Sequence, residues 1–397
     1  MSAAPTRFLS ERVAATLGRR AEPITSPMTP LLNLGQGTPD LPTPPHIIEA
    51  VHDALLDQPR VQYTDYAGIP MLREAIAEKL RRDNGLDYDP DREIMVTIGS
   101  QEAVWIAMQL LTDPGDEFLI GDPHYIVYDE VVELLGGKVV AIPSIVECGF
   151  QYDLDAMEAA ITPRTKAILL VSPDNPTGAV QEPEIVARIA EIAGRHDLFV
   201  ISDELYERFL FDGAVHTSFA TIPGMRARTI TIGGFSKAYA MTGWRVGYLA
   251  FPAELRAGAL LAKHSISICT PVPSQVAAHA ALTGPPAALN AMFAEWTARR
   301  TFFFYRLAEL GIPVVRTPGA YYAMADIRST GLTSAQFSRR FAEAEGVRVS
   351  PGSSFGPAGE GFVRVTYMTP RPVLDDALDR LGRFWTRVST PHQEEQT

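Results

Sequence analysis

Short apolar runs alternate with segments of helical periodicity between Glu93 and about Phe251. The pattern predicts strands at Ile94–Ile98, Glu117–Ile120, Lys138–Ile142, Lys166–Val171, Leu198–Ser202, Thr229–Ile232 and Val246–Phe251. It predicts helices at Ser100–Leu111, Ile126–Leu135 and Glu184–Ala193. Such alternation is typical of an α/β fold with a parallel or mostly parallel sheet covered by helices on both faces. Ligands bind beyond the carboxyl ends of such strands, so the residues that follow each strand are the first site candidates.

The pattern changes after about Pro285. A helical stretch at Ala287–Leu310 precedes strand-like pieces at Val314–Arg316, Tyr321–Asp326, Val347–Val349 and Phe362–Tyr367, and a helix at Val373–Val388. This order predicts a second, smaller α+β domain. We expect residues 48–290 to form the large domain, and residues 1–47 and 291–397 to form the small domain with an N-terminal arm. The proline-rich stretches 23–30 and 39–45 predict extended chain, and the polar residues 391–397 predict disorder.

Composition narrows the functional classes. Lys and Arg total 35 and Asp and Glu total 47, so the formal net charge is −12. The sequence contains no block of basic residues, which disfavours nucleic-acid binding as the main role. The two cysteines, Cys148 and Cys269, lie far apart in sequence, which favours a cytoplasmic protein without a disulfide framework. No apolar run has the length of a membrane span, and the eight histidines lack zinc-site spacing, so we expect neither a membrane partner nor a metal.

The strand at Thr229–Ile232 leads into a glycine-containing turn that ends in Lys237, and Arg245 follows eight residues later. A lysine that forms a Schiff base must be close to neutral, and burial or nearby positive charge lowers its pKa. Ser236 and Arg245 are suited to hold a phosphate, the arginine through its forked donors. Taken alone, the same residues also fit a surface lysine and a structural arginine.

Three other strand ends carry polar residues. The loop Ser-Pro-Asp-Asn-Pro-Thr-Gly at 172–178 places the amide of Asn175 where a ligand oxygen would lie. Asp203 ends a strand, and if a helix follows, Tyr206 lies one turn further on and can face the same site. If Asp203 is buried beside a pyridine nitrogen, its carboxylate would keep that nitrogen protonated. Ser100 and Gln101 begin a helix, where backbone N–H groups bind anions.

Each of these segments also fits a purely structural role. The loop at 172–178 could be a simple turn, and Asp203 and Ser100 could be ordinary helix caps. The combination favours a site, because four independent structural explanations would otherwise have to hold on one sheet.

With these residues in view, the chain resembles the class I aminotransferases of the fold-type I superfamily, which use pyridoxal 5′-phosphate (PLP), in the branch of prokaryotic aspartate aminotransferase-like enzymes. The resemblance covers nearly the whole chain and is carried by residues 33–40, 63–73, 113–117, 172–178, 203–206, 237, 241–248 and 362–367. It implies a PLP-binding large domain and transfer of an amino group from an L-amino acid to a 2-oxo acid.

The resemblance implies catalytic roles for three residues. Lys237 would form the Schiff base with PLP and move the proton at the substrate Cα. Asp203 would pair with the pyridinium nitrogen, and Tyr206 would hold the phenolic oxygen together with Asn175. Tyr125 would stack on the ring. We expect Glu204 to matter far less than Asp203, because a helix after the strand would point it elsewhere.

The remaining implied contacts concern the phosphate and the substrate. Ser100, Gln101, Ser236 and Arg245 would contact the phosphate. Tyr63 would reach the phosphate of a neighbouring subunit, which implies a homodimer with shared sites.

Arg364 would bind the substrate α-carboxylate beside Asn175 and the Gly37 backbone. The sequence departs from the aspartate-specific pattern at two of the implied positions. Tyr125 replaces the usual tryptophan, and Gln101 stands where dicarboxylate-binding members can carry a lysine. Gly234 also replaces a serine found in many relatives. We therefore expect a neutral or aromatic donor rather than aspartate.

Two alternatives remain at this point. Another PLP reaction on the same fold, such as C–S β-elimination or a biosynthetic oxidation or cyclisation of an amino acid, would share these motifs, because the cofactor supplies the chemistry. A non-catalytic regulator would need a DNA-binding segment, and the N-terminal arm is too short for one.

Overall fold

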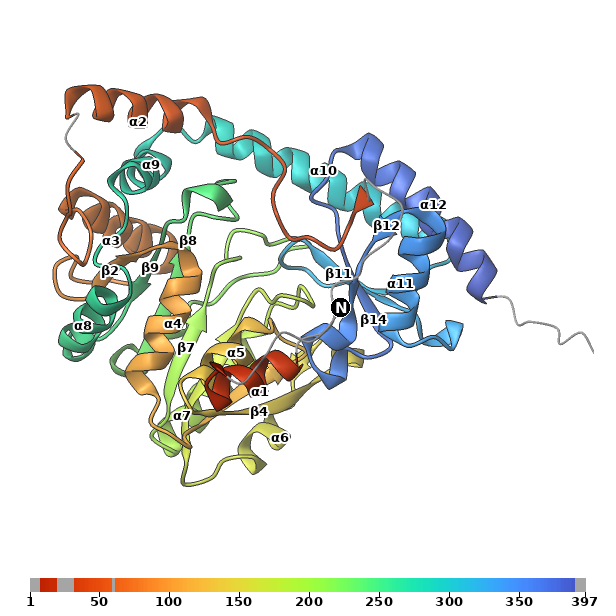
Figure 1. Cartoon of the computed structure of the whole chain (residues 1–397), viewed down its shortest axis with the longest axis horizontal. Coiled ribbons are helices and arrows are strands. Elements are labelled where there is room, and N and C mark those ends of the chain that lie inside the picture. The colour runs from red at the N-terminus through yellow and green to blue at the C-terminus, as the bar shows by residue number, and fades with distance from the viewer. Residues whose placement is uncertain (1–7, 20–31, 59–60, 390–397) are drawn as a thin grey trace, which may run out of the picture.

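The computed structural model describes residues 8–19, 32–58 and 61–389. Residues 23–30 and 391–397, for which extended and disordered chain were predicted, lie outside this range. Two larger sheets and a two-stranded one organise the described part of the chain (Figure 1). The larger sheet has the strand order β2-β9-β8-β7-β6-β3-β4-β5. Its strands are β2 (Ile94–Thr97), β3 (Glu117–Asp122), β4 (Lys138–Ile145), β5 (Gln151–Tyr152), β6 (Thr165–Val171), β7 (Phe199–Asp203), β8 (Thr229–Gly234) and β9 (Gly247–Ala250).

The larger sheet is mostly parallel, as the pattern predicted. Strands β4, β3, β6, β7 and β8 pair in parallel in that order. Strand β9 runs antiparallel to both of its neighbours, and the short β5 runs antiparallel to β4. The carboxyl ends of β6, β7 and β8 therefore meet at one edge, where β7 ends at Asp203 and the chain after β8 reaches Lys237.

Both faces of the larger sheet are buried, because successive strand side chains point in opposite directions. On β6, Leu169 packs with α4 (Gly99–Leu111), α5 (Val127–Leu134) and α8 (Arg256–Ile266), whereas Leu170 packs with α6 (Leu154–Ala159) and α7 (Pro183–Arg195). A strand with apolar neighbours on both sides must be apolar where it is covered, which explains the hydrophobic run from 167 to 171 within the predicted strand Lys166–Val171.

The C-terminal part is α+β, as predicted. Its antiparallel sheet has the order β10-β11-β14-β13. Its elements are α10 (Ala287–Glu309), β10 (Val314–Val315), β11 (Tyr322–Asp326), α11 (Ser334–Glu345), β12 (Val347–Arg348), β13 (Ser350–Pro351), β14 (Phe362–Thr366) and α12 (Arg371–Ser389). The N-terminal strand β1 (Leu32–Asn33) pairs in parallel with β12, so this segment joins the smaller part. The domain boundaries at residues 48 and 290 stay a prediction.

Among the described residues, seven helices were not predicted from the pattern: α1 (Glu11–Arg19), α2 (Pro45–Asp57), α3 (Pro70–Asn84), α6, α8, α9 (Val272–Thr283) and α11. Helices α2, α3 and α9 carry proline in their first turn, where the missing N–H costs nothing, so proline starts these helices instead of preventing them. Helix α9 packs against α2 and α3. Among the described residues, no helix combines the length and the apolar character that a bilayer crossing requires.

Candidate active site

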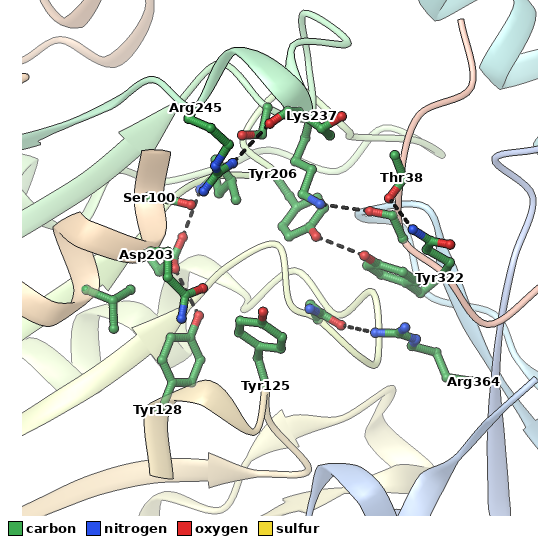
Figure 2. A pocket seen from close by; sticks show the side chains of 18 residues that line it. Thr38, Ser100, Tyr125, Tyr128, Asp203, Tyr206, Lys237, Arg245, Tyr322 and Arg364 are labelled. Carbon is green, nitrogen blue, oxygen red and sulfur yellow. Dashed lines mark hydrogen bonds between the residues drawn. The ribbon is translucent and has the colours of Figure 1, made fainter. Parts of the chain in front are cut away.

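A cavity of about 350 Å³ opens at the carboxyl edge of the larger sheet, facing β11 and β14 of the smaller one (Figure 2). Its walls include eleven of the twelve residues predicted for the site: Gly37, Ser100, Gln101, Tyr125, Asn175, Asp203, Tyr206, Ser236, Lys237, Arg245 and Arg364. Tyr63 does not line it. The walls also include residues that sequence reasoning missed, among them Gln36, Thr38, Tyr128, Thr242 and Tyr322.

Lys237 projects its amine into the middle of this cavity. Its Nζ donates a hydrogen bond to the carbonyl oxygen of Gly37 at 2.8 Å. Burial lowers the pKa of Lys237 below its usual value, and the positive charges of Arg364 and Arg245 lower it further. The amine is therefore more readily neutral than an exposed lysine, which a nucleophile toward a carbonyl requires.

Asp203 is buried at the end of β7. Tyr128, on α5, donates from its hydroxyl to Asp203 Oδ2 at 2.9 Å, and the N–H of Leu205 donates to Oδ1 at 3.1 Å. Burial raises the pKa of Asp203 to about 6, against these two stabilising hydrogen bonds. A cationic ring nitrogen beside this carboxylate would restore its charge and be held protonated by it.

Asp203 and Tyr206 both line the cavity, but the predicted helix between them is absent: turns follow β7 at residues 205–208. The hydroxyl of Tyr206 lies 3.0 Å from that of Tyr322, the first residue of β11. Tyr125 is partly buried and meets the ring of Tyr128 edge-on at 5.7 Å. Several phenol groups thus surround the space between Lys237 and Asp203.

Arg364 reaches the cavity from β14 and is only 7% exposed. One Nη donates to Asn175 Oδ1 at 2.6 Å, and the other donates to the carbonyl oxygen of Gly35 at 2.5 Å. Its Nε has no hydrogen-bond partner within the described residues. Sequence reasoning placed the Gly37 backbone next to this arginine; the carbonyl that contacts it belongs to Gly35, and the carbonyl of Gly37 contacts Lys237 instead.

Several hydrogen-bond donors meet in one corner of the cavity, at the start of α4. Ser100 and Gln101 line the cavity in the first turn of this helix, where backbone N–H groups favour negative charge. Arg245 approaches so closely that a Cβ on Gly99 would lie 2.5 Å from its Nη2, and the positive φ of Gly99, 70°, favours glycine at this position. Ser236 completes this corner. The donors suit a phosphate group.

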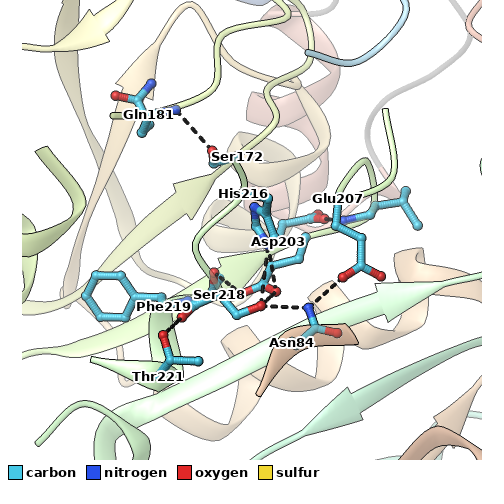
Figure 3. A network of polar contacts seen from close by, with 12 residues as sticks. Asn84, Ser172, Gln181, Asp203, Glu207, His216, Ser218, Phe219 and Thr221 are labelled. Carbon is cyan, nitrogen blue, oxygen red and sulfur yellow. Dashed lines mark hydrogen bonds and ion pairs between the residues drawn. The ribbon is translucent and has the colours of Figure 1, made fainter. Parts of the chain in front are cut away.

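Glu204 differs from its expected place. It is 3% exposed and belongs to a buried polar network with His216, Ser218 and Phe219, three of the residues that Figure 3 labels. Its carboxylate accepts hydrogen bonds from Ser218 Oγ at 2.6 Å, from Ser202 Oγ at 3.0 Å and from the N–H of Phe219 at 3.2 Å. His216 Nε2 lies 3.0 Å from it. Glu204 does not line the cavity; its carboxylate instead ties the end of β7 to the segment at 216–219.

Comparison with known proteins agrees with this geometry. The family model for aminotransferase class I and II matches residues 29–381. An aspartate aminotransferase of Pyrococcus abyssi is 40% identical over 92% of this chain and 94% of its own, and an aromatic-amino-acid aminotransferase of Thermococcus litoralis is 40% identical over 89% and 91%. The crystal structure of an aromatic aminotransferase from Pyrococcus horikoshii has a TM-score of 0.89 at 39% identity, covering 94% of this chain and 99% of that one.

The chain belongs to the aminotransferase class I and II family. It has the fold of that family and is a transaminase, which moves an amino group between an amino acid and a 2-oxo acid. The relatives do not favour the alternative reactions, elimination and cyclisation, that the motifs alone left open.

The network around Glu204 yields a stability prediction. Although burial raises the pKa of Glu204, His216 and the hydroxyl donors hold it below its ordinary 4.5, and Glu204 holds the pKa of the buried His216 above 6.5. The carboxylate's contribution is lost as pH falls through its lowered pKa, and the imidazolium's is lost as pH rises through its raised pKa. The pair therefore stabilises most between about pH 4.5 and 6.5.

Glu204→Gln should reduce the free energy of unfolding by roughly 3 kcal/mol at pH 6, because a buried partner loses its countercharge. Thermal unfolding from pH 4 to 10 would measure the loss, which should shrink toward both ends of the range. Glu191→Gln, which breaks an exposed pair with Arg188, serves as the control and should change little. A Glu204→Gln protein as stable as wild type at pH 6 would contradict the network's role.

Proposed function

We propose that this transaminase uses PLP and binds it in the cavity at the carboxyl edge of the larger sheet. The supporting observation is the convergence of a lysine of lowered pKa, a buried carboxylate and an anion-binding helix start on one cavity. Bound PLP would supply a carbonyl that captures amino groups and a ring that accepts electrons. The lysine, the carboxylate and the helix start are the protein groups that such a cofactor requires.

Each residue then has a task. Lys237 attaches the cofactor and carries the proton at the substrate Cα. Asp203, oriented by Tyr128, pairs with the ring nitrogen. Tyr206 and Asn175 donate to the phenolic oxygen, and Ser100, Gln101, Ser236 and Arg245 hold the phosphate together with the start of α4. Tyr125 covers the ring.

Arg364 binds the substrate α-carboxylate. Its guanidinium is planar and permanently charged, and the side-chain amide of Asn175 and the carbonyl of Gly35 fix its orientation. The Nε that lacks a partner among the described residues offers a further donor. Because its partners come from two separate segments, the clamp is set before substrate arrives, which limits the ordering cost of binding.

The half-reaction with one amino acid tests this proposal. Purified protein with PLP should show the absorbance of a lysine-bound cofactor, lose it on adding an amino acid and regain it on adding a 2-oxo acid. Asp203→Ala should slow this change by roughly 10³-fold or more, the scale of removing a preorganised electrostatic partner. Glu191→Gln is the control, since this exposed carboxylate on α7 does not line the cavity. Equal rates for Asp203→Ala and wild type would contradict the assignment.

We further propose that two copies assemble with shared sites. Tyr63 is 80% exposed, and large apolar side chains near it are exposed as well: Leu56 at 70%, Val61 at 50%, Met71 at 46% and Tyr66 at 40%. A largely apolar cavity of about 820 Å³ lies beside them, between α2 and α9. An apolar surface of this kind favours a protein partner, and a second copy would bring Tyr63 of the partner subunit to the phosphate corner.

Sedimentation equilibrium should therefore give a dimer. Tyr63→Phe should weaken PLP binding by roughly tenfold, as expected for a lost hydrogen bond to a charged phosphate, and should leave the dimer intact. An active monomer, or PLP binding indifferent to Tyr63→Phe, would contradict the shared site.

The choice of donor depends on Gln101 and Tyr125. The amide of Gln101 is neutral, and burying a distal carboxylate without a cation costs several kcal/mol. The similar proteins include aspartate and aromatic aminotransferases, so both donor classes occur among close relatives. We propose that this chain prefers neutral or aromatic donors to aspartate.

The comparison to make is kcat/KM for aspartate against phenylalanine, methionine, glutamine and kynurenine, with 2-oxoglutarate as acceptor. Gln101→Lys should improve aspartate relative to phenylalanine by about tenfold, equivalent to about 1.4 kcal/mol in the transition state. A wild-type enzyme that favours aspartate by such a factor would overturn this reading of Gln101 and Tyr125.

A further inference from the structure

The loop after β3 carries Tyr125, and the residue before it is a buried histidine. His124 is 4% exposed. Its backbone N–H donates to the carbonyl oxygen of Phe355 at 2.7 Å. At the start of the same loop, Asp122 Oδ2 accepts a hydrogen bond from the N–H of Ala358 at 3.2 Å. These two bonds tie the loop to a segment of the smaller part of the molecule, so Tyr125 stands where the two parts meet.

The ring of His124 lies between two hydrogen-bond acceptors. Its Nδ1 lies 2.7 Å from the carbonyl oxygen of Gly121, and its Nε2 forms an ion pair with Asp129 Oδ1 at 3.1 Å. A carbonyl oxygen can only accept, so Nδ1 must carry a hydrogen. If Nε2 had none, its lone pair would face a carboxylate and be repelled. The geometry therefore fits an imidazolium, whereas a neutral ring satisfies only one of the two contacts.

Ionisable groups face this ring from three elements. Asp129 and Tyr128 belong to α5, with the two rings of His124 and Tyr128 6.4 Å apart between centroids. Asp122 ends β3, and Asp174 lies in the loop after β6. The segment at 352–359, which contacts the same loop, carries no ionisable side chain. The surroundings of the ring are therefore acidic.

Burial alone would lower the pKa of His124, because it disfavours the charged ring. The carboxylate of Asp129 more than offsets this effect, and the carbonyl of Gly121 and the charge of Asp122 act in the same direction. The pKa of His124 is therefore raised above its usual 6.5. This direction agrees with the charged ring that the two contacts require.

Helix α5 links the ion pair to the proposed cofactor site. Next to Asp129 it carries Tyr128, whose hydroxyl donates to Asp203. The ring of Tyr128 meets that of Tyr125 edge-on, 5.7 Å between centroids, as Figure 2 shows. An ion pair that fixes the loop on α5 therefore also fixes the ring of Tyr125. The proposed function, on which this inference rests, places the cofactor ring against that side chain.

We propose that His124 is a positioning residue: as an imidazolium paired with Asp129, it holds the loop after β3 on α5 so that Tyr125 covers the cofactor ring. When the imidazolium loses its proton, its contact with the carboxylate becomes unfavourable and the loop is held less firmly. Since the pKa of His124 is raised, the contribution is complete below pH 6.5 and is lost as the pH rises through the raised pKa.

The first measurement is the titration of His124 by NMR in protein with isotope-labelled histidine, with and without PLP. The resonance is identified by its absence in His124→Gln. The ring should titrate above pH 6.5, and Asp129→Asn should move its titration to lower pH, because the countercharge is lost.

The second measurement is the dissociation constant of PLP in wild type and in His124→Gln at each pH. The ratio of the two constants cancels every titration that both proteins share. It should be about tenfold at pH 6, the scale of a lost charged contact, and should fall toward one above the pKa of His124. In an Asp129→Asn background the same substitution should have little effect, because the ring has no carboxylate to pair with.

His196→Gln is the matched control. His196 follows α7 and forms a partly exposed pair with Glu158 at 3.6 Å, outside the cavity, so its loss should leave PLP binding unchanged. If His124→Gln does not fold, Asp129→Asn alone decides, because it should weaken PLP binding at pH 6 and not at high pH.

A ring that titrates at or below pH 6.5, or PLP affinities whose ratio does not change with pH, would overturn the positioning role while leaving PLP binding in place. A histidine needed only for packing would give such a constant ratio. A wild-type protein that binds no PLP would instead overturn the proposed function, and the positioning role with it, whatever the NMR titration shows.

Discussion

A buried arginine holds together the parts of the chain that form the cavity. Arg364 extends from β14 of the smaller sheet and donates to Asn175, which follows β6 of the larger sheet, and to Gly35, which follows β1. A guanidinium so deeply buried loses its hydration, and these hydrogen bonds offset part of that cost. The same charge then lowers the pKa of Lys237 and that of Tyr322. One buried charge therefore influences two ionisable groups of the cavity.

Burial gives the two central ionisable groups opposite pKa shifts. It disfavours charge, so it lowers the pKa of Lys237 and raises that of Asp203 to about 6. A neutral amine is ready to react with a carbonyl, whereas the carboxylate gains its charge when a cationic ring nitrogen lies beside it. Glu204, the next residue in the chain, has the opposite shift because His216 and the nearby hydroxyls stabilise its charge. Of these two consecutive carboxylates, Asp203 lines the cavity, whereas Glu204 belongs to a buried network outside it.

Most of the cavity followed from one rule, that ligands lie at the carboxyl ends of parallel strands. Asn175, Asp203 and Lys237 all come shortly after predicted strands, and the structure brings them together. Tyr128 and Tyr322 could not be found in this way. Tyr128 lies within a helix and Tyr322 at the start of a strand in the other sheet, and only packing decides which face of those elements meets the cavity.

The remaining misses have local causes. Prolines at 44 and 45 suggested extended chain, but proline in a first turn begins α2. Glu204 was expected to point away along a helix; turns follow β7 instead and bury it. The antiparallel direction of β9 could not be predicted, because its sequence resembles that of the parallel strands. Strand direction is set by the connection and not by composition.

The central claim is that Lys237 is the amine that captures carbonyl groups in this cavity. Its most direct test is reduction of the protein with borohydride in the presence of PLP, followed by digestion and mass spectrometry. The account predicts a single pyridoxyl group on Lys237, and no label in Lys237→Ala. Labelling that falls instead on another buried lysine, such as Lys79 or Lys263, or no stable labelling at all, would contradict it.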